Sequence, residues 1–349
     1  MRLGWRERGV ELSNRMCPIV KVLVVGGAGY IGSHAVYEMI RAGHQVVVMD
    51  DLSTGSRAMV HPAATFRAGD ICVPGDLRNV FVAEQRQDAA PFDVVLHFAA
   101  KLVVPESFTL PLEYYHNNVE GVRLMLSAMT DFDVRNVVFS STAAVYGNPD
   151  GGGTCVEDTP ARPINPYGAT KLAAEELIRW VCAAYDMNFC IFRYFNVAGA
   201  DASLDIGLMR DHVTHLIPVA LQTGLGLRPS MTVHGSDYPT PDGTCIRDYV
   251  HVTDVAKAHV LGAQYLVERN ASLLANLGSG NGFSVNEVLA EAERHIHVPH
   301  TYGERRAGDP AKLIASNQLA KSVLGWESTL DLSDMIMSDL AFRRQPISL

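Results

Sequence analysis

The sequence predicts an α/β fold in which a doubly wound parallel sheet is joined to a smaller C-terminal domain. Short apolar runs alternate with helical patterns at least five times before residue 196, and such alternation favours parallel strands with right-handed crossovers. A glycine run stands between the first apolar run and the first helical pattern. The chain has 349 residues, 48% of them hydrophobic, which suits about two domains with ordinary cores.

The first elements follow the chain in order. Residues 20–25 are rich in β-branched side chains and predict a buried strand, and residues 31–43 have helical spacing closed by a glycine. Residues 45–49 predict a second strand. Further apolar runs predict strands, with helical patterns between most of them, at residues 66–68, 93–98, 136–140 and 189–193.

The composition and the strand pattern of the sequence change after Phe195. Residues 197–245 are rich in Gly, Pro, Asp and Thr and lack the strand rhythm. A strand-like stretch at 249–252, a helical pattern through about Arg269 and a run at 274–277 follow. We expect these elements to bring the chain back to the first sheet.

These patterns give a domain division. We expect residues 19–196, with 247–280 returning to them, to form the first domain, and residues 197–349 to form mainly the second. Residues 1–18 are expected to be an extension outside the fold. The first fifteen residues carry basic charge but no apolar segment of a secretory signal, and Met16 is a candidate start.

Composition and charge disfavour several functional classes. The 38 acidic and 29 basic side chains give a net charge of −9, which argues against nucleic acid as a partner. No apolar run approaches the roughly 18 residues of a membrane span. Six cysteines lack C-x-x-C pairs and metal-ligand spacing: Cys17, Cys72, Cys155, Cys182, Cys190 and Cys245. The sequence therefore predicts a soluble cytoplasmic protein that binds no metal, nucleic acid or membrane.

The glycine run Gly26-Gly-Ala-Gly29-Tyr30-Ile31-Gly32 predicts a dinucleotide site. Glycines let the backbone turn tightly and approach a pyrophosphate, whose charge meets the N–H groups at the start of the following helix. This run makes the predicted sheet Rossmann-like. Asp50 stands at the end of the second predicted strand, where a carboxylate accepts hydrogen bonds from a ribose and repels a 2′-phosphate. We therefore expect NAD rather than NADP, with Asp51 open as either a cap or a turn residue.

A tyrosine and a lysine one helical turn apart form the second signal. Pro166 suits the first position of a helix, so Tyr167 and Lys171 share one face. An ammonium beside a phenol favours the phenolate, which makes tyrosine a usable base. Thr142 follows the strand at 136–140, at the edge where open α/β sheets bind ligands. Together with a dinucleotide, these groups indicate hydride chemistry at a carbinol carbon.

At this point the chain resembles the extended short-chain dehydrogenase/reductase family, and within it the UDP-glucose 4-epimerases. The resemblance extends from about residue 20 to about residue 340. It is carried by these motifs: Gly26 to His34, Gly69-Asp-Ile71, His97-Phe-Ala-Ala100, Pro111-Leu-Glu-Tyr-Tyr115 with Asn117-Asn-Val119, Ser140 to Gly147, Tyr167 to Lys171, Arg193-Tyr-Phe-Asn196, Asp237 to Thr244, Arg247-Asp-Tyr249 and Arg305-Arg-Ala-Gly-Asp309.

The resemblance implies roles around the cofactor. Asp70 and Ile71 would belong to the adenine pocket. Phe98, Ala99 and Asn118 would lie along the cofactor, with core packing as the alternative for the first two. Lys101 falls in a loop that presents a lysine to the cofactor in such enzymes. Thr142, Tyr167 and Lys171 match the catalytic residues, and Lys171 would also contact the nicotinamide ribose.

The resemblance also implies a nucleotide-sugar site. Its residues would surround a UDP-hexose: Asn196, Leu216, Arg247, Arg306 and Asp309. Two arginines suit a diphosphate, because a guanidinium pairs bidentately with phosphate oxygens. His234 stands where the family usually stacks an aromatic ring on uracil. Leu313 stands where a tyrosine restricts the sugar pocket, so we expect room for an N-acetyl group unless Leu313 only packs the small domain.

The implied reaction inverts C4 of the sugar. Tyr167 would take the proton of the 4-hydroxyl while the C4 hydride passes to NAD, and Thr142 would hold the oxygen. A 4-keto sugar would then take the hydride back on its other face, so NAD stays bound. A 4,6-dehydratase would place an Asp-Glu pair after the catalytic Thr, whereas Ala143 and Ala144 follow here. A non-catalytic NAD-binding regulator would tend to lose the tyrosine or the lysine.

The family commonly forms homodimers through two helices. In this sequence they would span about 112–130 and 167–185. A homodimer is therefore the expected assembly.

Overall fold

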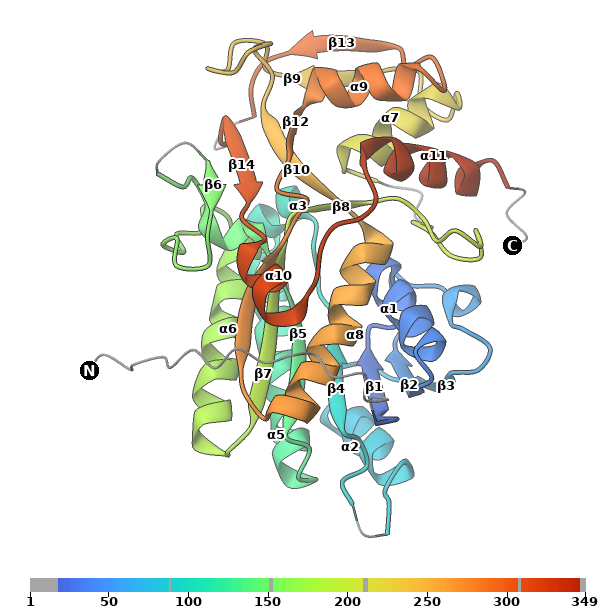
Figure 1. The fold of residues 1–349 in the computed structure, drawn as a ribbon, viewed down its shortest axis with the longest axis vertical. Coiled ribbons are helices and arrows are strands. Elements are labelled where there is room, and N and C mark those ends of the chain that lie inside the picture. The colour runs from blue at the N-terminus through green and yellow to red at the C-terminus, as the bar shows by residue number, and fades with distance from the viewer. Residues whose placement is uncertain (1–17, 88, 151–152, 210–212, 307–308, 346–349) are drawn as a thin grey trace.

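The computed structural model describes residues 18–345 apart from residue 88 and the segments 151–152, 210–212 and 307–308, and Figure 1 shows its ribbon. Nearly all of the extension expected at residues 1–18 lies outside the described residues. In the part of the chain that is described, no helix is long and apolar enough to cross a membrane.

A seven-stranded sheet forms the larger part of the molecule. Every neighbouring pair in it is parallel, and the strand order is β11-β7-β5-β4-β1-β2-β3. The strands are β1 (Lys21–Val25), β2 (Gln45–Asp50), β3 (Thr65–Ala68), β4 (Val94–His97), β5 (Asn136–Thr142), β7 (Asn188–Tyr194) and β11 (Leu273–Leu277). The predicted doubly wound α/β fold is confirmed.

Helices cover both faces of this sheet (Figure 1). Val22 and Val24 face one hydrophobic cluster, and Leu23 and Val25 face the other, as the alternation along a strand requires. The first cluster is completed by α1 (Tyr30–Arg41), α8 (Val252–Arg269) and α10 (Gln318–Leu324). The second is completed by α2 (Pro74–Ala83), α5 (Gly121–Asp131) and α6 (Pro166–Ala184).

Short elements occupy the loops that leave the strands of the large sheet. They are η1 (Arg57–Met59), α3 (Val104–Thr109), α4 (Pro111–Tyr115), η2 (His116–Glu120) and η3 (Ala143–Tyr146). The element η2 is a turn of π-helix that joins α4 to α5 without a break. Such turns are rare and are frequently found at functional sites.

A second sheet forms the upper part of the molecule in Figure 1. Its strands run in the order β12-β10-β14-β6, and β8 pairs with β10. They are β6 (Thr154–Cys155), β8 (Asn196–Ala198), β10 (Ile246–His251), β12 (Gly282–Ser284) and β14 (Lys312–Ala315). Beside it lie a strand pair and three helices: β9 (Met231–His234), β13 (His300–Gly303), α7 (Leu216–Gly224), α9 (Val285–Glu293) and α11 (Leu332–Arg343).

The second half of the chain contains structure that the sequence did not predict. The segment 197–245, whose sequence lacks the strand rhythm, contains α7 and β9, and the partner of β9 is β13, more than 60 residues later. The expectation that a strand at 249–252 returns to the large sheet is wrong, because residues 249–251 belong to β10 and pair with β8 in the second sheet, and Val252 begins α8. The place beside β7 is taken by β11 instead, and α8 and β11 do return to the large sheet.

Candidate active site

The glycine run forms the turn between β1 and α1. Gly26 has φ of +81°, and a Cβ there would lie 2.5 Å from the backbone nitrogen of Ala99. A Cβ at Gly32 would overlap the carbonyl oxygen of Gly26. The helix α1 begins at Tyr30 after Gly29, whose residue type offers no capping side chain. The turn therefore combines a close backbone approach with N–H groups at a helix start, a combination that suits a pyrophosphate.

Asp50 organises this turn from the end of β2. Its carboxylate is buried and accepts hydrogen bonds from the backbone N–H of Ala28 at 2.9 Å and of Leu52 at 2.8 Å. Burial raises the pKa of Asp50, and the two hydrogen bonds lower it. Each oxygen keeps a lone pair for a ribose hydroxyl. Asp51 is a turn residue, because it accepts hydrogen bonds from the N–H and hydroxyl of Ser53.

The residues expected at the adenine end follow β3. Asp70 accepts a hydrogen bond from the N–H of Cys72 at 2.8 Å, which fixes the local turn. Ile71 is buried and lies against Gly121, where a Cβ would be 3.0 Å from its side chain. Both residues therefore lie beside the carboxyl ends of β2 and β3, on the side where the adenine is expected.

The residues after β4 form the next wall. The N–H groups of Phe98 and Ala99 both donate to the carbonyl of Val25, at 2.8 and 3.2 Å. Asn118, in η2, is buried and brackets Lys101: its side-chain oxygen accepts from the Lys101 N–H at 2.8 Å, and its NH2 donates to the Lys101 carbonyl at 3.0 Å. Asn118 therefore holds the backbone of the loop that carries Lys101.

Thr142, Tyr167 and Lys171 come together where β5 meets the start of α6. The side chain of Asn165 caps α6 by accepting from the Gly168 N–H at 2.8 Å. The Thr142 side chain hydrogen-bonds that of Tyr167. The Lys171 ammonium is buried and donates to the carbonyl of Ser140 at 2.9 Å.

The electrostatics of the pair differ from the sequence-based expectation. Burial raises the pKa of Tyr167 to about 12, while the hydrogen bond with Thr142 lowers it. Burial lowers the pKa of Lys171 to about 7, with Glu175 acting in the opposite direction. The expected lowering of the phenol pKa by Lys171 is absent from these contributions. The desolvation of both side chains dominates, and the ammonium is directed at Ser140 and over the Phe139 ring, 4.9 Å from its centroid.

Sequence reasoning missed a buried ion pair behind this trio. Glu175, on α6, accepts hydrogen bonds from Arg193 on β7 at 2.6 and 2.9 Å and from the hydroxyl of Ser141 at 2.5 Å. The Arg193 guanidinium also stacks on Tyr146, 4.9 Å from the ring centroid. The spacing of Glu175, four residues after Lys171 on the same helix face, was the available signal.

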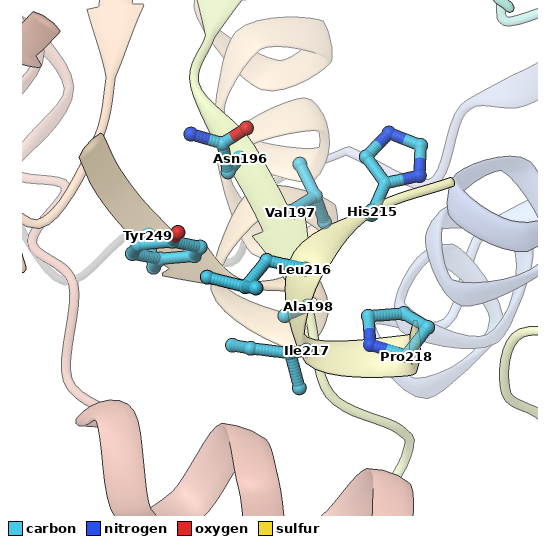
Figure 2. Close-up of a pocket in the computed structure, with 8 residues that line it drawn as sticks. All are labelled: Asn196, Val197, Ala198, His215, Leu216, Ile217, Pro218 and Tyr249. Atoms are coloured by element: carbon cyan, nitrogen blue, oxygen red, sulfur yellow. The ribbon is translucent and has the colours of Figure 1, made fainter. Parts of the chain in front are cut away.

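The residues expected around the substrate lie near the second sheet. A pocket between β8, β10 and the start of α7 is lined by the residues drawn in Figure 2: Asn196, Val197, Ala198, His215, Leu216, Ile217, Pro218 and Tyr249. Arg247 pairs in register with Leu313 and forms an ion pair of 3.6 Å with Asp309. These expected residues are therefore brought to neighbouring strands.

The remaining expected residues lie at β9 and β13. His234 ends β9, pairs in register with Gly303, and hydrogen-bonds the carbonyl of Glu304 at 3.3 Å through Nδ1. Arg306 is exposed just after β13. Among the described residues, no group of three or more His, Cys, Asp or Glu side chains could hold a metal ion.

Comparisons with known proteins agree with this geometry. A family model described as the NAD dependent epimerase/dehydratase family matches residues 22–278. The chain is 46% identical over 319 residues to the UDP-glucose 4-epimerase of Lacticaseibacillus casei, covering 90% of this chain and 94% of that protein.

Two solved structures share the fold over most of their length. UDP-glucose 4-epimerase from Brucella ovis, in complex with NAD, matches with a TM-score of 0.87 and 41% identity, covering 92% of this chain and 97% of that one. The UDP-Glc/GlcNAc 4-epimerase of Campylobacter jejuni matches with a TM-score of 0.81 and 37% identity, covering 93% and 99%. The chain therefore belongs to the NAD dependent epimerase/dehydratase family and, within it, to the UDP-glucose 4-epimerases.

Proposed function

We propose that this chain interconverts UDP-glucose and UDP-galactose as an NAD-dependent 4-epimerase that inverts C4 through a 4-keto intermediate. The observation that carries the proposal is the meeting of Thr142, Tyr167 and Lys171 at the carboxyl edge of the large sheet, the edge at which the glycine turn follows β1. Membership of the UDP-glucose 4-epimerases supports the substrate class.

The large sheet binds the cofactor. Gly26 and Gly32 give the close approach that a pyrophosphate needs, and Asp50 accepts the adenosine ribose hydroxyls. The wall beside the dinucleotide is completed by Tyr30, Ile31, Asp70, Ile71, Phe98, Ala99, Lys101 and Asn118. NAD, when bound, supplies the acceptor and donor of the C4 hydride, and its oxidised ring adds a positive charge that favours a neighbouring phenolate.

Tyr167 is the general base for the 4-hydroxyl and returns the proton in the second half-reaction. Its pKa of about 12 in this structure means that the phenolate depends on nearby positive charge. The oxidised nicotinamide ring of bound NAD would supply that charge. Lys171, one turn along α6, directs its buried ammonium to the carbonyl of Ser140. Thr142, hydrogen-bonded to Tyr167, holds the substrate oxygen and stabilises its developing charge.

The second sheet anchors the UDP group. Arg247 and Arg306 pair with the diphosphate. Asn196 and Asp309 lie around the nucleotide sugar beside it. Leu216 and His234 lie toward the base. Firm nucleotide contacts with few sugar contacts would allow the 4-keto sugar to turn over between the two hydride transfers.

The sugar pocket also admits N-acetylated substrates. Leu313 lies opposite Arg247 on β14 and is partly buried beside Ala143 and Phe195. A leucine is shorter than tyrosine and leaves room for an acetamide. One structural relative is named as a UDP-Glc/GlcNAc 4-epimerase, which supports this breadth.

A 4,6-dehydratase is disfavoured by the residues after Thr142. Dehydration needs an additional acid and base at C5 and C6 of the sugar. Ala143 and Ala144 begin η3 instead, and the Ala144 N–H donates to the Thr142 hydroxyl oxygen at 3.1 Å. The positions that would supply the acid and base carry methyl groups.

A homodimer in a reducing compartment, the cytoplasm, is the proposed setting. Large apolar side chains are exposed on the surface around α3, α4 and α6: Phe108, Leu112, Trp180 and Tyr185. Leu112 is 83% exposed and Trp180 77% exposed, which is unusual for such side chains on a closed monomer surface. The cysteines in the described ranges are all free, which fits a reducing compartment.

The decisive experiment is an assay of purified protein on UDP-galactose without added NAD. We expect UDP-glucose as the product and NAD(H) in the supernatant after denaturation, because each cycle regenerates the cofactor. Recovery of NADP, release of a 4-keto-6-deoxy sugar, or turnover only with freely exchanging cofactor would overturn the proposal.

A further inference from the structure

The carboxylate of Asp248 is a buried junction outside the catalytic trio. Asp248 lies in β10 and is 0% exposed. One oxygen accepts from the N–H and the hydroxyl of Ser279, both at 2.8 Å. The other accepts from the N–H of Gly280 at 3.1 Å and of Ala315 at 3.0 Å. A single side chain thereby ties β10 to β14 and to the loop between β11 and β12.

Three residues of the proposed substrate site lie on β10, which carries Asp248, and on the neighbouring strands β8 and β14. Asn196 donates through its side chain to the backbone carbonyl of Asp248 at 3.0 Å. Arg247 is the preceding residue of β10, and it pairs in register with Leu313, two residues before Ala315 on β14. Loss of the hydrogen bond between Asp248 and the Ala315 N–H of β14 would therefore change the position of Leu313 relative to Arg247.

We propose that Asp248 is a positioning residue for the UDP-sugar: it sets the separation and register of the strands that carry Asn196, Arg247 and Leu313. The inference rests on the proposed function, because it assigns those three residues to the substrate. Asp248 itself lies behind them and touches neither the reacting carbon nor the catalytic trio.

The chemistry of the junction requires a carboxylate. Four donors converge on two oxygens, and an ionised carboxylate is an acceptor at every lone pair. An asparagine offers one oxygen, and its NH2 would face two N–H donors. The space is also closed, since a Cβ at Gly278 would lie 2.5 Å from Oδ2 of Asp248. A carboxylate therefore accepts from donors that an amide would leave unpaired, and it has little room to move.

The test compares Asp248→Asn with wild type, both as NAD-loaded protein. Because the amide leaves buried donors of β14 and of the loop unpaired, β14 should shift against β10, and we expect the Kd for UDP and the KM for UDP-galactose to rise about tenfold or more. We expect kcat to change by less than about threefold, because Tyr167 and Lys171 lie on α6 of the large sheet. Amide hydrogen exchange at Gly280 and Ala315 should speed up, while the β5 amides keep their protection.

A second variant makes the test independent of folding defects in the first. Gly278→Ala leaves all charges in place, but its Cβ would lie 2.5 Å from both Oδ2 of Asp248 and the Cβ of Ala315, so the junction must shift. This variant should raise the Kd for UDP in the same direction. Its matched control is Gly75→Ala on α2, where a Cβ meets nothing within 4 Å, and this variant should bind UDP as wild type does. If Asp248→Asn does not fold, Gly278→Ala decides.

The inference is overturned if the folded variants bind UDP within about twofold of wild type, or if kcat falls while KM stays constant. It is also overturned if exchange at Gly280 and Ala315 is unchanged. Failure of the proposed function looks different, because wild-type protein would then not epimerise UDP-galactose. The exchange comparison at Ala315 would still report on Asp248.

Discussion

Replacing Glu175 with glutamine should destabilise the protein strongly, because it leaves a buried guanidinium without its counter-charge. The side chains of Arg193 and Glu175 are 5% and 1% exposed and meet at 2.6 Å. Removing one partner of a buried ion pair costs about 3–5 kcal/mol. Glutamine keeps one acceptor for Ser141 or Arg193 but turns an NH2 toward the other donor.

The expected loss can be read as a melting temperature. An unfolding entropy of about 2.1 cal/mol/K per residue gives about 0.7 kcal/mol/K for 349 residues, so Glu175→Gln should lower Tm by about 4–7 °C. The matched control is Glu327→Gln, which breaks an ion pair with Lys321 of similar length, 2.7 Å, whose side chains are 54% and 61% exposed. Exposed pairs contribute about 0–1 kcal/mol, so the control should shift Tm by no more than about 1.5 °C.

Two results bear on the reasoning. If Glu175→Gln melts no lower than Glu327→Gln, the buried charge does not dominate and the argument is refuted. The double variant Glu175→Met with Arg193→Met should recover at least half of the lost Tm, since it removes both charges together.

The remaining predictions concern the site. Tyr167→Phe should reduce turnover at least about 10²-fold with UDP binding retained, measured by steady-state kinetics and calorimetry, and more than a tenth of wild-type activity would exclude Tyr167 as the base. The Lys171 pKa of about 7 lies below the usual 10.5, so the penalty for its buried charge is present below pH 7 and fades as pH rises toward 10.5. Denaturant unfolding should therefore show wild type gaining stability relative to Lys171→Met between pH 7 and 10, and a constant difference would contradict this burial effect. Leu313→Tyr should abolish turnover of UDP-N-acetylglucosamine and keep that of UDP-galactose; loss of both would show that the position does not gate the pocket.

The large sheet could be predicted because its strands are short continuous apolar runs that need no partner to be recognised. Both faces of such a strand are buried, and β1 and β2 show this directly. The second sheet gave no such signal. Its strands β6 and β8 have two and three residues, and β9 pairs with β13 across a long separation. Pairings of that kind depend on tertiary contacts rather than local pattern.

The features of the site that depend on local sequence could be predicted, and those that depend on tertiary contacts could not. The glycine turn and Asp50 could be predicted because their chemistry follows from consecutive residues and one strand end. The pKa of Tyr167 could not, because it depends on how deeply the phenol is buried. The spacing of Tyr167 and Lys171 could be predicted as well, but the direction of the ammonium toward Ser140 could not.

The position of the catalytic trio follows from how β5 and α6 contact each other. Three consecutive residues, 140–142, meet three side chains spaced four apart along the helix. The carbonyl of the first accepts from Lys171, the hydroxyl of the second donates to Glu175, and the side chain of the third hydrogen-bonds Tyr167. Because all three contacts lie on one helix face, a rotation of α6 would break them together.

The strand β7 explains why this rotation of α6 is resisted. Arg193 on β7 pairs in register with Ser141 on β5, and both side chains reach the same carboxylate of Glu175. Two neighbouring strands thus hold the helix at Glu175. Their hydrogen bonds to the charged carboxylate are stronger than neutral ones. Any loosening at Glu175 is transmitted one turn along α6 to Lys171, so its removal should disturb the pH dependence of turnover as well as the stability.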